Sequence, residues 1–492
     1  MTAYRVTLLI IMAGTTTLYS LSMTLVNIVL PQLQGAMSST QEQISWVVTL
    51  NVLATAMATP LTGSLVSLFG SRIVLLVCTS IFTIATFVCG LSTSLESLIL
   101  FRIIQGAAGA PLMPLCQATL LQNFPTHEHA KVNGIFGIAV VVGPAIAPSL
   151  GGYLAETYDW RWVFFIMVPL GLFALLGNYK FLIDSGRQEN TKFDFMGFIL
   201  FSTAIVSLQL IIDRGETEAW LESSKIISFL VVAVASFYFF ISTSFYVYQP
   251  YIKFEIFRNK NYFLGVILVF IYGSLNFTPL VLLPSMLQQL QDYPDTLVGW
   301  VLAARGCGMV VGFFIASRMG RLDPRVGMLF GMCLISSSGW AMSVFNFQTS
   351  FETITWASTI QGVGCGILWV PLTVITFSTM PKSLYPDASA FFHLLRNLGT
   401  SIFVGISVAL LIRSATTNYS EITGYINKFG ERLIFPFVSG ENSFNWGSDL
   451  TYLASEITEQ SLMIAYNNVF FFYSMICLLT LPILSLITIR KT

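Results

Sequence analysis

Apolar stretches long enough to cross a membrane recur from one end of the chain to the other, and this pattern constrains the fold more than any other feature. A helix of about 20 apolar residues spans the hydrocarbon core of a bilayer. We find about fourteen such stretches, which predict an all-α polytopic membrane protein. They lie near 6–33, 44–69, 72–92, 96–123, 132–156, 161–183, 195–212, 225–247, 261–290, 296–317, 324–345, 352–380, 388–413 and 465–489.

The composition agrees with a lipid environment and excludes several classes of function. Charged residues make up 10% of the 492 residues, against roughly 25% in soluble domains. The formal net charge is zero, so no basic surface and no nucleic-acid partner are expected. The sequence has no phosphate-binding loop and no closely spaced cysteine and histidine ligands, which predicts no cofactor and no metal. The loops offer no nucleophile beside a base, so an enzyme is not expected.

The distribution of lysine and arginine predicts the orientation in the membrane. If the N-terminus lies inside, most of the 24 basic residues fall in inner loops. Cytoplasmic loops of membrane proteins carry such an excess of positive charge. Both termini are therefore predicted to be cytoplasmic.

An internal repeat divides the chain. Ile104-Gln105-Gly106 returns as Ile360-Gln361-Gly362, and each is followed by two prolines at similar spacing. Gly63 to Arg72 likewise returns as Gly312 to Arg321. Repeats of this kind place a binding site at the midplane between two related halves. We predict a six-helix bundle over 1–185, two inserted helices over 186–250, and a second six-helix bundle over 251–492 with an outer loop at about 414–460.

Three motifs occur in order in the first half of the chain. The first is Asn27-Ile28-Val29-Leu30-Pro31. The second comprises Leu98, Arg102, Gln105 and Gly106, and the third is the string from Gly143 to Gly152. Together they resemble the fourteen-span drug/proton antiporter subfamily of the major facilitator superfamily, and the resemblance covers nearly the whole length.

The resemblance implies a function and its surroundings. It implies a secondary active transporter that exports small amphipathic compounds, such as drugs, dyes, metabolites or siderophores, across a bacterial inner membrane by alternating access. Proton exchange would drive the export. The implied partners are the lipid bilayer, the small-molecule substrate and, in double-membraned cells, a periplasmic adaptor protein. The alternatives are an uncoupled or differently coupled facilitator of a specific metabolite, and a transporter-like sensor.

Proton coupling needs a group that gains and loses a proton inside the membrane. Ser22, Ser67 and Asn468 stand where the family usually has an acidic residue, and every carboxylate lies in a loop or near the end of a span. The remaining candidates are Arg102, which in the family is implicated in coupling, and His393. Arg102 has the alternative role of donating hydrogen bonds to backbone carbonyls, and His393 has that of a packing residue.

Polar, aromatic and methionine side chains within the spans are candidates for a substrate cavity, since they adapt to varied apolar molecules and orient them. The arginines among them would attract an anionic substrate or cap a broken helix. The candidates are Met23, Asn27, Trp46, Asn51, Gln105, Met113, Gln117, Asn276, Gln288, Arg305, Trp369 and Arg396.

Glycine and proline residues mark where helices pack closely or bend. We predict a conformational motif made of two groups of such residues. They are Gly63, Gly70 and Arg72 after the second span, and Gly143, Pro144, Pro148, Gly151 and Gly152 in the fifth.

Overall fold

The computed structural model describes residues 3–182, 193–216, 218–247, 249–319, 323–425 and 448–487. These residues form helices and no strand, so the predicted all-α class is confirmed. By length and composition twelve helices could cross a membrane, and the bent pair α3 and α4 adds a thirteenth. Helix α15 covers the remaining predicted stretch and packs along α16 and α18.

The first part of the chain forms ten α-helices in the described residues. They are α1 (Ala3–Ile28), α2 (Leu30–Ala36), α3 (Gln41–Ala58), α4 (Leu61–Phe69), α5 (Ser71–Leu91), α6 (Leu95–Gly109), α7 (Leu112–Asn123), α8 (His129–Thr157), α9 (Trp162–Phe165) and α10 (Met167–Phe181), with the short helix η1 (Thr126–Glu128) before α8.

The middle and last parts follow. At the place of the two predicted inserted helices lie α11 (Phe195–Arg214) and α12 (Ser224–Ser244), with η2 (Trp220–Glu222) between them. The last part comprises η3 (Phe254–Arg258), α13 (Lys260–Leu290), α14 (Asp295–Arg318), α15 (Pro324–Met342), α16 (Phe351–Ser378), η5 (Lys382–Leu384), α17 (Tyr385–Gly424), α18 (Ser448–Leu479) and η7 (Leu481–Leu486).

Prolines break three of the expected spans. Pro31 opens α2 directly after α1, Pro60 separates α3 from α4, and Pro111 separates α6 from α7. Proline lacks the backbone N–H of an ordinary helical residue and its ring clashes with the preceding turn, so the helix kinks there. The α3–α4 break bends the chain by 53°.

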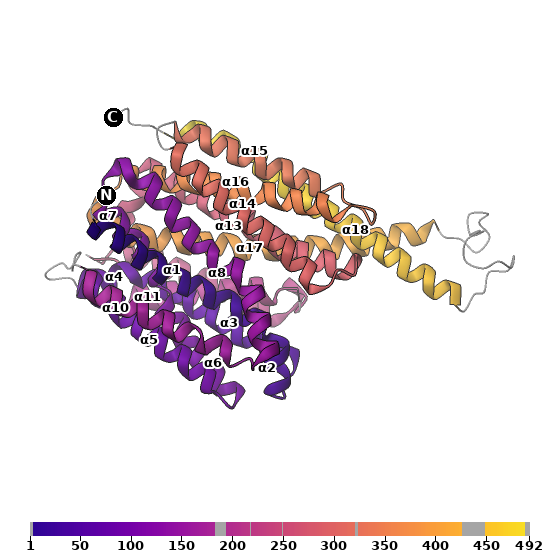
Figure 1. Ribbon diagram of the computed structural model, residues 1–492, viewed down its shortest axis with the longest axis horizontal. Coiled ribbons are helices and arrows are strands. Elements are labelled where there is room, and N and C mark those ends of the chain that lie inside the picture. The colour runs from indigo at the N-terminus through magenta and orange to yellow at the C-terminus, as the bar shows by residue number, and fades with distance from the viewer. Residues whose placement is uncertain are drawn as a thin grey trace.

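The two halves have separate apolar cores. One core is built from described residues between 8 and 182. Two further cores draw on residues between 256 and 487, joined by Ala118 and Leu121 of α7 and by the partly buried Ala130, Ile138 and Val141 of α8. A fourth cluster brings the inserted helices against Ala56 of α3 and Leu394 and Leu398 of α17. In Figure 1 the helices of the first half lie together on one side and those of the last half on the other.

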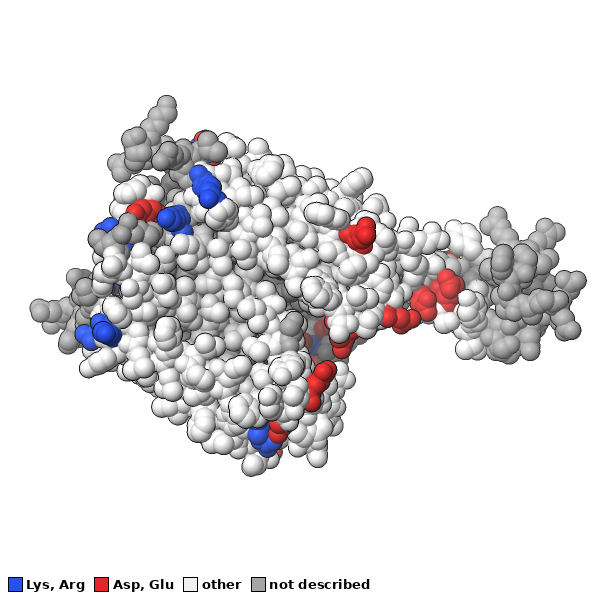
Figure 2. Space-filling view, viewed as in Figure 1, with Lys and Arg blue, Asp and Glu red and all other residues white. Residues whose placement is uncertain are grey.

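Charged residues lie toward the two ends of the molecule. Figure 2 shows most of the visible lysine and arginine at one end with some acidic residues beside them, most of the visible acidic residues toward the other end, and a broad uncharged band between the two ends. The hydroxyl of Tyr4, at the start of α1, donates to the carbonyl of Phe181 at 3.0 Å. Arg325, at the start of α15, donates to the carbonyl of Ile487. In Figure 1 the start of α1 lies at the basic end of the molecule, and so does the end of the described residues.

Helices α17 and α18 project beyond the other helices at the acidic end (Figure 1). The sequence predicts a loop over about 414–460, but α17 continues to Gly424 and α18 begins at Ser448. The two helices contact each other in this region, where Asn418 donates to the carbonyl of Ser461 at 3.3 Å. Such pairing stabilises helical structure in a polar segment that hydropathy alone does not predict to be helical. Residues 426–447 of the predicted loop lie outside the described residues.

Candidate substrate and coupling site between the halves

A hydrogen bond between His393 and Gln117 joins the two halves. His393 on α17 and Gln117 on α7 are both buried, and the His393 Nε2 atom lies 2.8 Å from the Gln117 Oε1 atom. Ser389, one turn before His393, donates to the same oxygen at 3.1 Å. The Gln117 Nε2 atom donates to Asn133 on α8 at 3.4 Å. Because the amide oxygen only accepts, His393 carries a proton on Nε2 and donates it.

Arg396 lies one helical turn from His393 and also faces the other half. Its Nη2 atom lies 3.5 Å from the sulfur of Met113 on α7 and 3.1 Å from the Oδ1 atom of Asn397. Its guanidinium carbon lies 5.9 Å from the centre of the Trp369 ring. Trp369 in turn lies 6.2 Å from the His393 ring. The structure thus brings together five of the predicted residues: Met113, Gln117, Trp369, His393 and Arg396.

Arg102 is buried inside the first half, away from this site. Its Nη1 atom donates to the Oε1 atom of Gln105 at 2.6 Å, and its Nε atom lies 3.4 Å from the carbonyl of Val47. Gln105 donates to Thr86 at 2.6 Å, and Asn51 donates to the carbonyl of Arg102 at 2.7 Å. Arg102 therefore donates both to a side chain and to a backbone carbonyl, and its role in coupling stays a prediction.

Arg305 is the corresponding buried arginine of the second half. Its Nε atom donates to the Oε1 atom of Gln361 at 2.6 Å, and its Nη2 atom to the backbone carbonyl and side chain of Asn276 at 2.5 and 2.7 Å. Gln361 donates onward to the carbonyl of Leu275 and to Tyr473. Arg305 thus ties α14 to both α13 and α16.

Four predicted cavity residues lie elsewhere. Met23 is half-buried and Asn27 exposed near the end of α1. Gln288 is close to the end of α13, where it donates to Asp295 at 2.9 Å. Trp46 lies at the start of α3, with the Arg214 guanidinium 4.3 Å from its ring centre.

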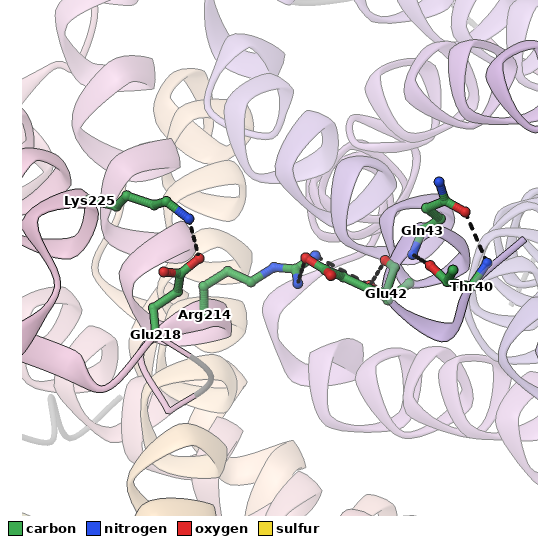
Figure 3. A network of polar contacts seen from close by, with 7 residues as sticks. Thr40, Glu42, Gln43, Arg214, Glu218 and Lys225 are labelled. Carbon is green, nitrogen blue, oxygen red and sulfur yellow. Dashed lines mark hydrogen bonds and ion pairs between the residues drawn. The ribbon is translucent and has the colours of Figure 1, made fainter.

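The surroundings of Arg214 connect the inserted helices to the first half. Figure 3 shows Arg214 extending from the end of α11 toward Glu42, with the two charges 3.9 Å apart. Beside it Lys225 and Glu218 form an ion pair at 2.8 Å, and the hydrogen bond from Lys225 lowers the pKa of Glu218. Thr40 and Gln43 cap the start of α3 through reciprocal hydrogen bonds (Figure 3).

The predicted conformational motif lies at helix contacts. Gly70 joins α4 to α5 with a φ of 86°, a conformation that favours glycine. Arg72 donates to the carbonyl of Tyr179 at 2.8 Å. A side chain at Gly63 would collide with Asp387 at the start of α17, where Asp387 is paired with Lys253 at 2.9 Å. Gly320 and Arg321, the repeat partners of Gly70 and Arg72, lie outside the described residues.

The glycine and proline string of the fifth span differs from residue to residue. A Cβ atom at Gly143 would lie 2.5 Å from the Ser20 side chain and 2.7 Å from the Leu21 nitrogen, so α1 and α8 meet closely there. Gly151 faces Leu25 and Ile28, whereas nothing lies within 4 Å of such an atom at Gly152. Pro144 and Pro148 lie within α8.

The halves meet at the basic end and separate at the acidic end. The hydrogen bonds given above between α7 and α17 are joined by a reciprocal pair between Gln122 and Lys382, both at 3.1 Å. Figure 2 shows the surface hollowed between the halves on the side of the acidic residues. The halves are thus joined by hydrogen bonds at the basic end, and the surface between them is hollowed on the acidic side.

Sequence reasoning missed Ser389, Asn133 and the Lys253–Asp387 pair. Ser389 stands four residues before His393 and shares its helix face, so helical spacing would have found it. Asn133 and Lys253 carry no such signal, because their partners come from distant segments.

The sequence profile of the Major Facilitator Superfamily matches residues 12–404. The chain belongs to this superfamily. It is 32% identical over 459 residues to the multidrug export protein EmrB of Escherichia coli (strain K12), covering 92% of this chain and 89% of that one. It is 27% identical to the fatty acid resistance protein FarB of Neisseria gonorrhoeae, covering 94% and 92%.

Solved transporter structures share the fold. The human organic anion transporter MFSD10 superposes with a TM-score of 0.65 at 12% identity, over 98% of this chain and 100% of that one. The proton:xylose symporter XylE superposes with a TM-score of 0.63 at 12% identity, over 96% and 95%. The superfamily member described here is thus a multi-pass membrane transporter, with the lipid bilayer and a small molecule as its partners.

Proposed function

We propose that this protein is a secondary active exporter of small amphipathic compounds, driven by proton exchange in a bacterial inner membrane with both termini inside. The observation that carries the proposal is the His393–Gln117 hydrogen bond. Among the described residues, His393 is the one histidine in the interior of a span. It lies where α7 and α17 meet, a contact between the halves that we call the seam. The name of the relative EmrB, a multidrug export protein, supports the substrate class.

The seam gives a mechanism for alternating access. With the basic end closed, His393 donates from Nε2 to Gln117, and its Nδ1 atom is buried with no hydrogen-bond partner among the described residues. A proton arriving at Nδ1 would place a second cation beside Arg396 in an apolar interface. Such a charge destabilises the closed seam relative to one open to water. Protonation would therefore favour opening at the basic end, and release of the proton inside would favour closure.

The projecting part of α17 and α18 supports one further element of the proposal. A 40-residue helix is about 60 Å long, roughly twice the thickness of the hydrocarbon core. With the basic end inside, the projection extends to the outer side. We place the docking site for a periplasmic adaptor protein there.

The test is transport by the purified protein in liposomes with an imposed pH gradient. Ethidium and a dansyl fatty acid serve as probes, and His393→Ala is compared with wild type. We expect gradient-driven transport in wild type and its loss in His393→Ala. His127→Ala, which removes an exposed histidine, is the matched control and should behave as wild type.

Three other results would contradict the proposal in different ways. Transport that ignores the gradient would make the protein a facilitator. Gradient-driven transport that persists in His393→Ala would move the coupling to another group, with Arg102 next to be tested. Binding of a probe without any flux would indicate a sensor.

A further inference from the structure

Among the described residues, three buried arginines within the spans have no carboxylate paired with them. Arg102, Arg305 and Arg396 are at most 9% exposed. The ion pairs found among the described residues join Arg161 to Asp159, Arg214 to Glu42, Lys225 to Glu218 and Lys253 to Asp387, and none includes a buried arginine. A buried charge is costly unless it is paired or fully hydrogen bonded.

Two of the three arginines are well bonded within their own half. Arg102 donates to Gln105, and Arg305 donates to Gln361 and to Asn276 at 2.5 to 2.7 Å. Amide and carbonyl oxygens are strong acceptors, so each of these two guanidinium groups has at least one short hydrogen bond to a good acceptor.

Arg396 differs because its partners are poor. One is the Met113 sulfur, a weak acceptor, and the other is the amide oxygen of the adjacent Asn397. The Nε atom of Arg396 is buried and makes no hydrogen bond to any described residue. Arg396 is also the one of the three that contacts the opposite half of the protein.

Two more unpaired nitrogen atoms lie beside it. The Trp369 Nε1 atom, which can only donate, and the His393 Nδ1 atom are both buried without a partner in the described part of the chain. Both side chains are at most 2% exposed. Trp369 lies within 6.2 Å of both the Arg396 guanidinium and the His393 ring. Two nitrogen atoms that need acceptors, Arg396 Nε and Trp369 Nε1, therefore lie at one point of the seam, beside the unprotonated Nδ1 atom of His393.

Aromatic rings surround this point. The Tyr272 ring lies 5.0 Å from Trp369, and the rings of Phe136 and Phe392 lie 6.4 and 5.6 Å from His393. An acceptor held here would thus be attached to an apolar body. The chemistry fits a molecule with one negative group and an apolar remainder.

We propose that Arg396 and Trp369 bind the anionic group of an amphipathic monoanion, such as a carboxylate, between the two halves. This inference rests on the proposed export function and specifies its substrate class. The anion would supply the charge that Arg396 lacks and accept hydrogen bonds from Arg396 Nε and Trp369 Nε1.

The experiment measures binding to the full chain in lipid nanodiscs with three fluorescent probes. These are a dansyl undecanoate anion, its uncharged methyl ester, and the cation ethidium. We expect the anion to bind at least about tenfold more tightly than the ester, since a hydrogen bond to a charged group contributes about 1.5 kcal/mol or more. Arg396→Gln should weaken anion binding by about tenfold or more and leave ester binding unchanged.

Matched variants separate the site from general effects of charge. Arg413→Gln makes the same change on the same helix at an exposed position and should bind the anion as wild type does. Arg396→Lys keeps the charge and should recover part of the affinity. Trp369→Phe removes one donor and should weaken anion binding by about threefold. Unchanged ester binding shows that a variant is folded.

The outcomes distinguish this inference from the proposed function. Equal affinity for anion and ester, or anion binding unaffected by Arg396→Gln, would overturn the anion site even if ethidium is transported. Binding of the anion that depends on Arg396 without transport of any probe would support the site and overturn the export function. Failure of all three probes to bind would count against both.

Discussion

The two halves of the protein each bury an arginine against the glutamine of the repeated Ile-Gln-Gly sequence, but they supply that arginine from different helices. In the first half Arg102 and Gln105 both lie on α6, one turn apart. In the second half Arg305 comes from α14 and Gln361 from α16. The repeat has thus kept the acceptor and changed the origin of the charge.

The glycine after each glutamine explains how this exchange fits the same packing. A side chain at Gly106 would collide with the backbone carbonyl of Asn51, and one at Gly362 with that of Arg305. Asn51 and Arg305 therefore occupy equivalent places in the two halves. The backbone contact is common to both, and the side chains at that place are free to differ.

Substitution of the two arginines should give the largest difference between the halves in the free energy of unfolding. Arg305→Gln leaves acceptors on both α13 and α16 without a donor, so we expect a loss of about 3 kcal/mol or more. Arg102→Gln removes one short bond within a helix and one long bond to Val47, and should cost about 1 to 2 kcal/mol. Thermal unfolding in detergent measures both.

Arg318→Gln is the control for Arg305, because it makes the same change at an exposed position at the end of α14. It should unfold at nearly the wild-type temperature. If Arg102→Gln lowered the unfolding temperature as much as Arg305→Gln, the hydrogen bonds that join α14 to α13 and α16 would contribute no more to stability than those of Arg102.

The two glycines should respond alike, and this prediction tests what the halves share. Gly106→Ala and Gly362→Ala each force a Cβ atom into a backbone carbonyl, which cannot move aside as a side chain can. Each should destabilise the protein by about 1 to 3 kcal/mol. Gly152→Ala, where nothing lies within 4 Å, should have little effect on the same unfolding measurement. Tolerance of one substitution and not the other would break the proposed equivalence.

Substitution of the hydrogen-bond partners of Gln105 and Gln361 should give the smallest difference between the halves in the free energy of unfolding. Thr86→Val removes the acceptor that Gln105 Nε2 uses, and an unpaired buried N–H costs about 1 kcal/mol or more. Tyr473→Phe removes one partner of Gln361 Nε2, which keeps the carbonyl of Leu275 at 2.8 Å. Its loss should be about half as large. An effect of Tyr473→Phe that exceeds that of Thr86→Val would show that the second network depends on the hydroxyl.

Much of the fold could be predicted from local features of the sequence. The apolar stretches predicted the helices, because a bilayer requires about 20 apolar residues per span and internal backbone hydrogen bonds. The repeated Ile-Gln-Gly predicted two related parts, and its glycines proved to lie at equivalent backbone contacts. The three proline breaks and the helical extension over 414–424 were not predicted, since hydropathy does not register where a helix bends or continues into a polar region.

The candidate site was predicted residue by residue but not as an arrangement. His393, Arg396, Trp369, Gln117 and Met113 were each candidates because polar and charged groups within a membrane span are costly and must have a reason to be there. The sequence by itself determined that these groups exist and that no carboxylate accompanies them. Only the tertiary structure decided that α7 and α17 meet, that Arg102 and Arg305 are satisfied within their own halves, and that Arg396 is not. The physical reason is that a hydrogen bond depends on distances of a few ångströms between helices far apart in the chain, and no local pattern encodes those distances.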